Sequence, residues 1–211
     1  FYFVIMLDLA RLYNKNTNMK YILLTLSIFS LNLFAQDWED LQSLPESAST
    51  RHHPVTFSIG GYGYLVAGAD AEYVSLSDFY QYDPTSDSWT QLDNFPGTSR
   101  GFAYGVETET KGYMGFGYYF NPDTGEDAYL DDLWEYDPET DTWTELATCP
   151  CTPRIHPAMV EVNGKIYVGL GGSEFGDLGD WWEYDIETDT WTERADFPSS
   201  NRHHPYYFSI G

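Results

Sequence analysis

The sequence is poor in basic residues. Its 211 residues include 10 lysines and arginines against 33 aspartates and glutamates, which gives a formal net charge of −23 at pH 7. A surface this acidic repels the phosphates of nucleic acids and the headgroups of anionic lipids. We therefore exclude nucleic acid as a partner and expect a protein or a carbohydrate ligand instead.

Cysteine is also scarce, because only Cys149 and Cys151 are present, on either side of Pro150. A disulfide between them would close a strained ring, and a metal or redox site would need further ligands that the sequence does not place. Cys149 occupies the same place in an internal repeat as Phe95 and Phe197. We interpret it as a small buried apolar residue, and we expect no metal and no cofactor.

Long apolar runs are missing except for one near the N-terminus. Tyr21–Phe34 is mostly apolar and follows Met19 and Lys20, but it is shorter than the roughly 20 residues that span a bilayer. This layout predicts a signal peptide over residues 19–35, with 1–18 as upstream sequence or an extended N-terminus. We therefore expect a bacterial exported protein, periplasmic, cell-surface or extracellular, without a membrane span after signal removal.

Helical periodicity is absent after residue 35, and a repeat of 48 to 54 residues takes its place. Each of four tryptophans lies seven residues before a proline, and the last three also lie seven residues after a tyrosine and eleven before an arginine. The tryptophans are Trp38, Trp89, Trp143 and Trp191. Self-similarity of this length indicates a repeat architecture.

One repeat unit contains four short runs that are rich in aromatic and β-branched residues and bounded by turn residues. The first unit places them at 51–59, 62–67, 78–82 and 88–92. Asp83-Pro84 and its equivalents favour a turn between the third and fourth runs, and Asn163-Gly164 favours a tight hairpin between the first two. A repeated four-stranded antiparallel unit of this length predicts the blades of a β-propeller.

The repeated pattern Arg…Tyr-x-x-x-Gly…Tyr-Asp-Pro…Trp-Thr…Pro resembles the kelch family over residues 37–211. Kelch blades usually end their second strand with two glycines. Here the pairs are Ala67-Gly68, Phe116-Gly117 and Leu170-Gly171, so only the second glycine is present. The resemblance implies an all-β, kelch-type propeller of four-stranded antiparallel blades.

The repeat also predicts the domain organisation. A propeller has roughly 4 to 8 blades, so we expect this chain to be a fragment with three complete blades. The predicted segments are 36–50 for an orphan fourth strand and its link, 51–99, 100–153 and 154–201 for the blades, and 202–211 for the first strand of a further blade.

The basic and imidazole side chains gather at one point of the repeat. Four arginines begin the innermost strands, and all five histidines follow them. These residues are Arg51, Arg100, Arg154, Arg202, His52, His53, His156, His203 and His204. In kelch propellers this position resembles the channel mouth, where arginines often contact ligands. A guanidinium can bind a carboxylate, and an imidazole can act as a ligand, an acid or a base.

Two alternatives stay open for these residues. The arginines either contact a ligand or pair with the acidic loops on the same face, such as those with Asp132 and Asp180. Phe102 stands in the second unit where the others have a histidine, which favours a packing role over a metal ring.

The loop between the second and third strands is longest in the second unit, at Tyr118–Asp131. Long loops on a rigid scaffold commonly carry function. Asn121, Asp123 and Asp127 offer oxygen ligands for calcium, but their spacing matches no recognised calcium loop, so we expect a solvated loop. Aromatic residues outside the repeat are candidates for stacking on a sugar or a partner. They are Tyr73, Tyr118, Tyr119, Phe120, Tyr129 and Phe175.

These observations favour a binding module over an enzyme. Its ligand would be a protein or a glycan, held on the face with the repeat arginines and histidines. The candidate ligand-binding residues are Arg51, Arg100, Arg154, Arg202, His53, His156, Tyr119 and Phe120, and no catalytic residue is assigned. The alternative is a sugar-acid mutarotase or epimerase, like the periplasmic sialic-acid kelch enzymes. A copper radical oxidase is disfavoured because Cys149 and Cys151 have no evident tyrosine partner.

Overall fold

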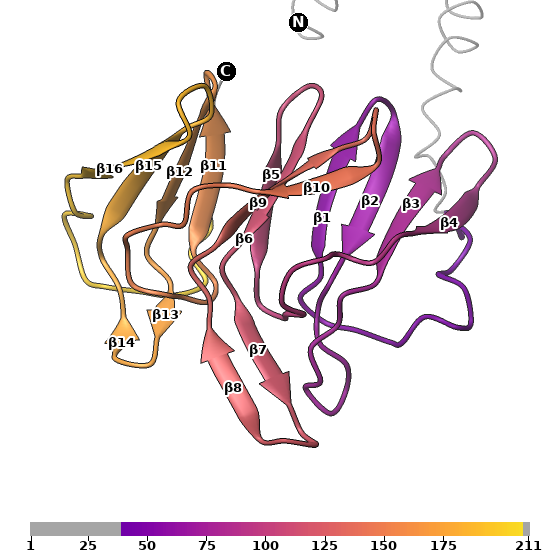
Figure 1. Ribbon diagram of the computed structural model, residues 1–211, viewed down its shortest axis with the longest axis horizontal. Helices are drawn as coiled ribbons and strands as arrows, with labels where there is room; N and C mark the ends of the chain where they lie inside the picture. The colour runs from indigo at the N-terminus through magenta and orange to yellow at the C-terminus, as the bar shows by residue number, and fades with distance from the viewer. Residues whose placement is uncertain (1–38, 209–211) are drawn as a thin grey trace, which may run out of the picture. The chain divides into compact units, whose positions relative to one another are not determined.

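The computed structural model describes residues 39–208, and this range contains strands and loops but no helix (Figure 1). The predicted signal peptide at 19–35 and the segment 1–18 lie outside the described residues. Within the described range, no helix is long and apolar enough to cross a membrane. The chain divides after Leu41, and the fold described below is that of the unit from Gln42 onward.

Three antiparallel sheets of four strands form the unit, as the repeat predicts. The first sheet contains β1 (Val55–Ile59), β2 (Tyr62–Val66), β3 (Phe79–Asp83) and β4 (Ser88–Leu92). The second contains β5 (Tyr104–Glu107), β6 (Gly112–Gly115), β9 (Leu133–Asp137) and β10 (Thr142–Glu145). The third contains β11 (Ala158–Val162), β12 (Lys165–Gly169), β15 (Trp181–Asp185) and β16 (Thr190–Arg194). Strand order within each sheet follows the sequence, so each sheet is one blade.

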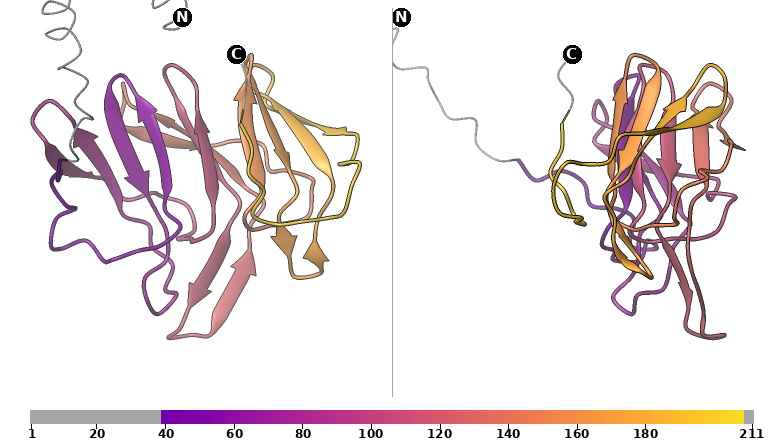
Figure 2. Two further views of the ribbon diagram at one scale, coloured as in Figure 1. Left: turned by 180° about the vertical axis from the view of Figure 1, so that it is seen from behind. Right: turned by 90° about the vertical axis from the view of Figure 1, so that its left-hand side faces the viewer.

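Alternating side chains give the inner strands a buried face. In β1, Val55, Phe57 and Ile59 are buried while Thr56 and Ser58 are exposed, because successive residues of a strand point to opposite faces. The three inner strands β1, β5 and β11 lie side by side, with β5 in the middle (Figure 2). Their packing places the buried faces of neighbouring blades against each other.

The recurring tyrosine, aspartate and tryptophan residues build the outer hairpin of each blade. Tyr184 on β15 donates its hydroxyl to Asp189 at 2.7 Å, and Trp191 on β16 lies opposite Tyr184. Asp189 has a positive φ of 51°, which the short turn requires. Tyr82 with Asp87 and Tyr136 with Asp141 repeat this hydrogen bond in the other blades. The spacing seen in the sequence therefore reflects one hairpin made three times.

The outer tryptophans of the second and third blades also pack against the preceding blade. The ring of Trp143 lies 5.4 Å from that of Phe79, and Tyr136 lies 4.7 Å from the same ring. Trp191 approaches Phe116 of the second blade in the same way. Aromatic pairs at these separations add stability beyond their buried area, so the blades are joined by two aromatic and aliphatic cores.

The strand boundaries differ from the prediction at the inner strands. The first strand was expected to begin at Arg51, but it begins at Val55. His53 has a φ of 51°, and this left-handed conformation cannot continue an extended strand. The strands expected within 36–50 and 202–211 are not formed at 39–50 or 202–208, because a strand needs a hydrogen-bonded neighbour and no described strand pairs with either segment.

The long loop of the second blade is exposed to solvent at residues 122–128, as expected, but it is more regular than a loop. It folds into a second hairpin, β7 (Tyr118–Asn121) paired with β8 (Glu126–Tyr129), and the third blade has a shorter equivalent, β13 (Gly172–Ser173) with β14 (Gly176–Asp177). Both project from the edge of the sheets opposite the β1–β2 and β11–β12 turns (Figure 1). A Pro-Asp-Thr-Gly turn joins the two strands, and Tyr118 of β7 lies opposite Tyr129 of β8.

Close packing of the inner strands makes glycine necessary at Gly105. A Cβ atom there would clash with the Val55 side chain and lie 2.6 Å from the Tyr113 carbonyl oxygen. We expect Gly105→Ala to lower the free energy of unfolding by about 2 kcal/mol. Gly63→Ala is the matched control, because its Cβ would lie 3.7 Å from the nearest atom, on Tyr82. Equal midpoints for both variants in urea unfolding would contradict this view of blade packing.

Candidate functional site

The arginine at the start of each inner strand is held in a repeated network. Arg154 is fully buried and donates through Nε to the Thr152 carbonyl at 2.9 Å and through Nη1 to the Leu170 carbonyl at 3.1 Å. Its two terminal nitrogens also bind both carboxylate oxygens of Asp180, at 2.8 and 2.7 Å. Equivalent networks join Arg100 to Thr98, Phe116 and Asp132, and Arg51 to Ser49, Ala67 and Asp78.

The same arginine also links two blades through its backbone. Arg100 accepts a hydrogen bond from Gly68 and donates one to the carbonyl of Leu76, at 2.9 and 3.0 Å, and both partners belong to the first blade. Its side chain binds Asp132 of the second blade. Arg154 makes the same backbone bonds with Gly117 and Leu130, so both arginines are fixed to the preceding blade by the main chain and to their own blade by the guanidinium.

This arrangement decides between the two alternatives for three of the arginines. Pairing with loop carboxylates is confirmed for Arg51, Arg100 and Arg154, whose side chains are 3%, 0% and 0% exposed. Their donors are used by the protein, so we no longer place them on a ligand surface. Arg202 is half-buried and donates to Ser199 and Ser200. The carboxylate partners of the other three arginines lie 26 to 32 residues downstream, which is farther than the sequence extends after Arg202.

Burial and charge act in opposite directions on the carboxylate of Asp180. Burial alone would raise the pKa of Asp180, but the hydrogen bonds and charge of Arg154, together with a hydrogen bond from Trp182, lower it below its usual value. Asp180 therefore stays ionised, which is the form that a bidentate guanidinium pair requires.

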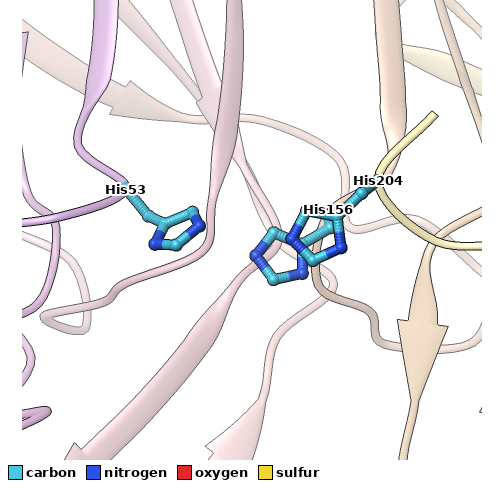
Figure 3. Close-up of side chains that lie close together, drawn as sticks. All are labelled: His53, His156 and His204. Carbon is cyan, nitrogen blue, oxygen red and sulfur yellow. The ribbon is translucent and has the colours of Figure 1, made fainter. Parts of the chain in front are cut away.

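Three histidines from separate parts of the chain meet beside these networks. His53, His156 and His204 have a φ of 51°, 49° and 50°, and Phe102 has 59° at the equivalent position of the second blade. This shared left-handed conformation turns four rings toward one place. The ring of His156 lies 5.0 Å from His53, 3.5 Å from His204 and 5.1 Å from Phe102 (Figure 3).

Burial sets the protonation of this histidine cluster. Burial, with smaller contributions from His204 and His53, lowers the pKa of His156 to about 3. Burial is also the main cause that lowers the pKa of His53 and of His204. All three imidazoles are therefore neutral at pH 7, which leaves a lone pair on each ring for a ligand.

Two further histidines flank the cluster and have partners of their own. Nδ1 of His52 lies 2.7 Å from Nδ1 of His53. Nδ1 of His203 lies 2.7 Å from a carboxylate oxygen of Asp177, at the end of β14, and the side chain of His203 is half exposed. An imidazole oriented by a carboxylate at the surface is suited to proton transfer.

The β7–β8 hairpin forms one wall of a cavity of about 390 Å³. Tyr118, Asp127 and Tyr129 line it from the hairpin, and Glu174 and the highly exposed Phe175 line it from the third blade. Burial and a hydrogen bond to Asp127 raise the pKa of Tyr118 to about 12, so its hydroxyl remains a donor at neutral pH. The cavity thus combines ring faces with carboxylate oxygens.

The two aromatic candidates of this hairpin lie elsewhere. Tyr119 and Phe120 are half-buried on β7 and do not line the cavity. The backbone N–H of Phe120 donates to the Ser75 hydroxyl of the first blade at 3.0 Å, and the backbone N–H of Ser75 donates to the Phe120 carbonyl at 3.3 Å. The aromatic candidates that do reach the cavity are Tyr118, Tyr129 and Phe175. Strand alternation could have separated Tyr118 from Tyr119, but only after β7 had been recognised as a strand.

The cysteines lie in the link between the second and third blades. Cys149 and Cys151 are 2% and 7% exposed, and they are joined by a disulfide. The expected burial of Cys149 is confirmed, while the disulfide was not expected. Both residues belong to the apolar core between these two blades.

Comparisons with known proteins agree with this geometry. Residues 117–150 match the kelch motif family model. This motif, the two relatives below and the fold of YjhT together support a kelch-repeat family. Among solved structures, that of YjhT matches 78% of this chain and 57% of its own, with a TM-score of 0.65 and 20% sequence identity. That likeness concerns the fold.

Two kelch-type relatives carry a functional name. An N-acetylneuraminate epimerase of Yersinia enterocolitica is 33% identical over 143 residues, which is 62% of this chain and 35% of the relative. An N-acetylneuraminate epimerase of Pasteurella multocida is 30% identical over 116 residues, or 51% of this chain and 29% of the relative. The chain therefore spans about a third of the length of these curated relatives.

The backbone conformation explains why only the second residue of each kelch double-glycine pair is glycine in this chain. Phe116 and Gly117 have φ values of 63° and 99°, and the other two pairs adopt the same conformation. A Cβ at Gly117 would lie 2.6 Å from the Gly101 carbonyl oxygen, so the second residue must be glycine. The first position accepts a side chain in the left-handed region, which explains the departure from the usual kelch pattern.

The buried ion pair between Arg154 and Asp180 predicts a contribution to the free energy of unfolding that is lost in acid. We expect Asp180→Asn to lower the free energy of unfolding by about 3 kcal/mol at pH 7, because it leaves Arg154 buried without a countercharge. Because the folded pKa of Asp180 is depressed, this contribution is complete above the unfolded pKa of about 4 and disappears as pH falls through the folded value.

Chemical unfolding of both proteins between pH 7 and pH 2 measures this difference. Asp123→Asn is the matched control, because Asp123 lies exposed in the β7–β8 turn. A difference between the wild-type protein and Asp180→Asn that stays constant down to pH 2 would show that the ion pair is not its source.

Proposed function

We propose that this chain is part of a sugar-acid epimerase of the mutarotase type, acting where Arg202, His203 and the histidine cluster lie together. The observation that carries the proposal is the imidazole of His203, which is oriented by the Asp177 carboxylate and lies 4.9 Å from the ring of His204 in the histidine cluster. The names of the two curated relatives support the same chemistry.

The substrate of such an enzyme carries a carboxylate, which needs a cation. We assign this role to Arg202, whose guanidinium donates to the hydroxyls of Ser199 and Ser200 at 3.2 and 3.3 Å. A guanidinium can hold a carboxylate through two parallel hydrogen bonds.

Interconversion of two anomers requires only proton transfers. A base removes the proton of the anomeric hydroxyl, the ring C–O bond breaks, and the ring oxygen gains a proton. Rotation and reclosure on the other face then return both protons, so the atoms balance. His203 with Asp177 is the group that we assign to this step, since burial makes His156 too weak a base at neutral pH.

We expect the 211-residue chain to accelerate anomer interconversion of N-acetylneuraminate, measured by NMR exchange. Arg202→Met should raise KM about 10-fold or more, because it removes a charged contact to the carboxylate. His203→Gln should instead lower kcat about 100-fold, because it removes the proton carrier.

Arg194→Met is the matched control for the loss of a positive charge. Arg194 pairs with Glu183 on the outer strands, away from the histidine cluster, and its side chain is 48% exposed. Its replacement should change neither KM nor kcat. Absence of any acceleration over buffer, or an equal effect of all three variants, would overturn the proposed activity.

A second function is favoured by the cavity beside the β7–β8 hairpin. Phe175 is 83% exposed, and with Tyr118 and Tyr129 it offers ring faces on which sugars can stack. Asp127 and Glu174 would accept hydroxyl hydrogen bonds and repel an anionic ligand. These features support binding of a neutral glycan at a site separate from the histidines.

We expect Phe175→Ala to abolish the retardation of the protein in native gels that contain a soluble neutral polysaccharide, such as hydroxyethylcellulose or galactomannan. Tyr62→Ala is the control, because Tyr62 is also exposed but lies at the opposite β1–β2 turn. Migration unchanged by either polysaccharide in the wild-type protein would exclude this binding, as would equal losses in both variants.

A further inference from the structure

The histidine cluster has the composition of a metal site. His53, His156 and His204 each offer one ring nitrogen, and these three atoms all lie within 4.8 Å of one another (Figure 3). Three imidazoles on one zinc ion, at about 2.0–2.1 Å from the metal, place their nitrogens roughly 3.3 Å apart. Small side-chain rotations therefore suffice to bring all three onto one ion.

His156 supplies an independent observation. It is 5% exposed, and neither of its ring nitrogens has a hydrogen-bond partner among the described residues. A buried polar group without a partner is costly, and such groups in folded proteins usually indicate a missing ion, water or ligand. The unpaired imidazole lies between the rings of His53 and His204, so a metal ion there would satisfy it.

The surroundings also suit a bound metal. His52 approaches Nδ1 of His53, which leaves Nε2 of His53 for the ion and fixes the orientation of the ring. The ring of Phe102 lies 4.8 Å from His53 and 5.1 Å from His156, so it forms an apolar wall. Neutral imidazoles without a carboxylate favour zinc and related transition metals over calcium or magnesium.

We propose that His53, His156 and His204 bind a Zn²⁺ ion with three protein ligands and a fourth position open to water or substrate. The sequence alone favoured packing for these residues, because Phe102 interrupts the histidine pattern. Phe102 nevertheless lies beside the three histidines, which leaves three ligands and one apolar neighbour. Three histidines and an open position make up the arrangement of catalytic rather than purely structural zinc sites. This site does not depend on the proposed epimerase activity.

Titration of the tag-free 211-residue chain with Zn²⁺ alone tests the proposal. We expect one saturable site that excess Ca²⁺ does not displace, and Co²⁺ in its place should give the visible absorption of a four-coordinate ion. His156→Phe should weaken binding more than about 10-fold. This variant should still fold, because Phe102 shows that phenylalanine is accepted in the same left-handed conformation.

Two further variants make the test specific. Phe102→His should strengthen zinc binding about 10-fold, because it adds a fourth imidazole beside the other three. His203→Gln should leave zinc binding unchanged, because His203 pairs with Asp177, whereas it should impair the proposed epimerase. Zinc that is displaced by Ca²⁺, or that binds His156→Phe as tightly as the wild-type protein, would overturn the site and assign the ion to surface carboxylates.

Discussion

The buried ion pair between a repeat arginine and a loop carboxylate is the interaction on which the rest of the structure depends. Arg100 and Arg154 have no exposed surface, and each binds Asp132 or Asp180 through two parallel hydrogen bonds. Desolvation of these charges is offset only while every donor has an acceptor. The backbone at each arginine must therefore keep one conformation. That conformation positions the histidine or phenylalanine that follows two residues later.

Much of the fold could be predicted from the sequence, because the spacing of a few residues records local contacts. The distance from Tyr184 to Trp191 fixes one antiparallel hairpin, and Asp189 closes its turn. The sequence also placed the arginines and the acidic loops at the same end of the blades. The sequence left the pairing of arginine with aspartate open. A spacing of 26 or 32 residues between Arg and Asp places both at the same end of a blade, but it does not show whether their side chains point toward each other.

The candidate site was harder to predict, for two physical reasons. The histidines lie far apart in the sequence and meet only because His53, His156 and His204 share a left-handed backbone that composition does not reveal. The hairpin of the second blade was missed because its strands are short, and Tyr118 and Tyr119 face different surroundings. Burial and pairing with carboxylates then removed Arg51, Arg100 and Arg154 from the candidate ligand residues.

The repeated left-handed residue has a consequence for how such a molecule can change over evolutionary time. In each of the three blades, the left-handed residue turns its side chain toward the histidine cluster, and the salt bridge of the preceding arginine fixes the backbone that carries it. Duplication of a blade would therefore add one more side chain at the equivalent position, directed toward the same cluster. Substitution of that side chain alone would leave the backbone and its salt bridge unchanged. Scaffold and chemistry are consequently free to diverge at different rates.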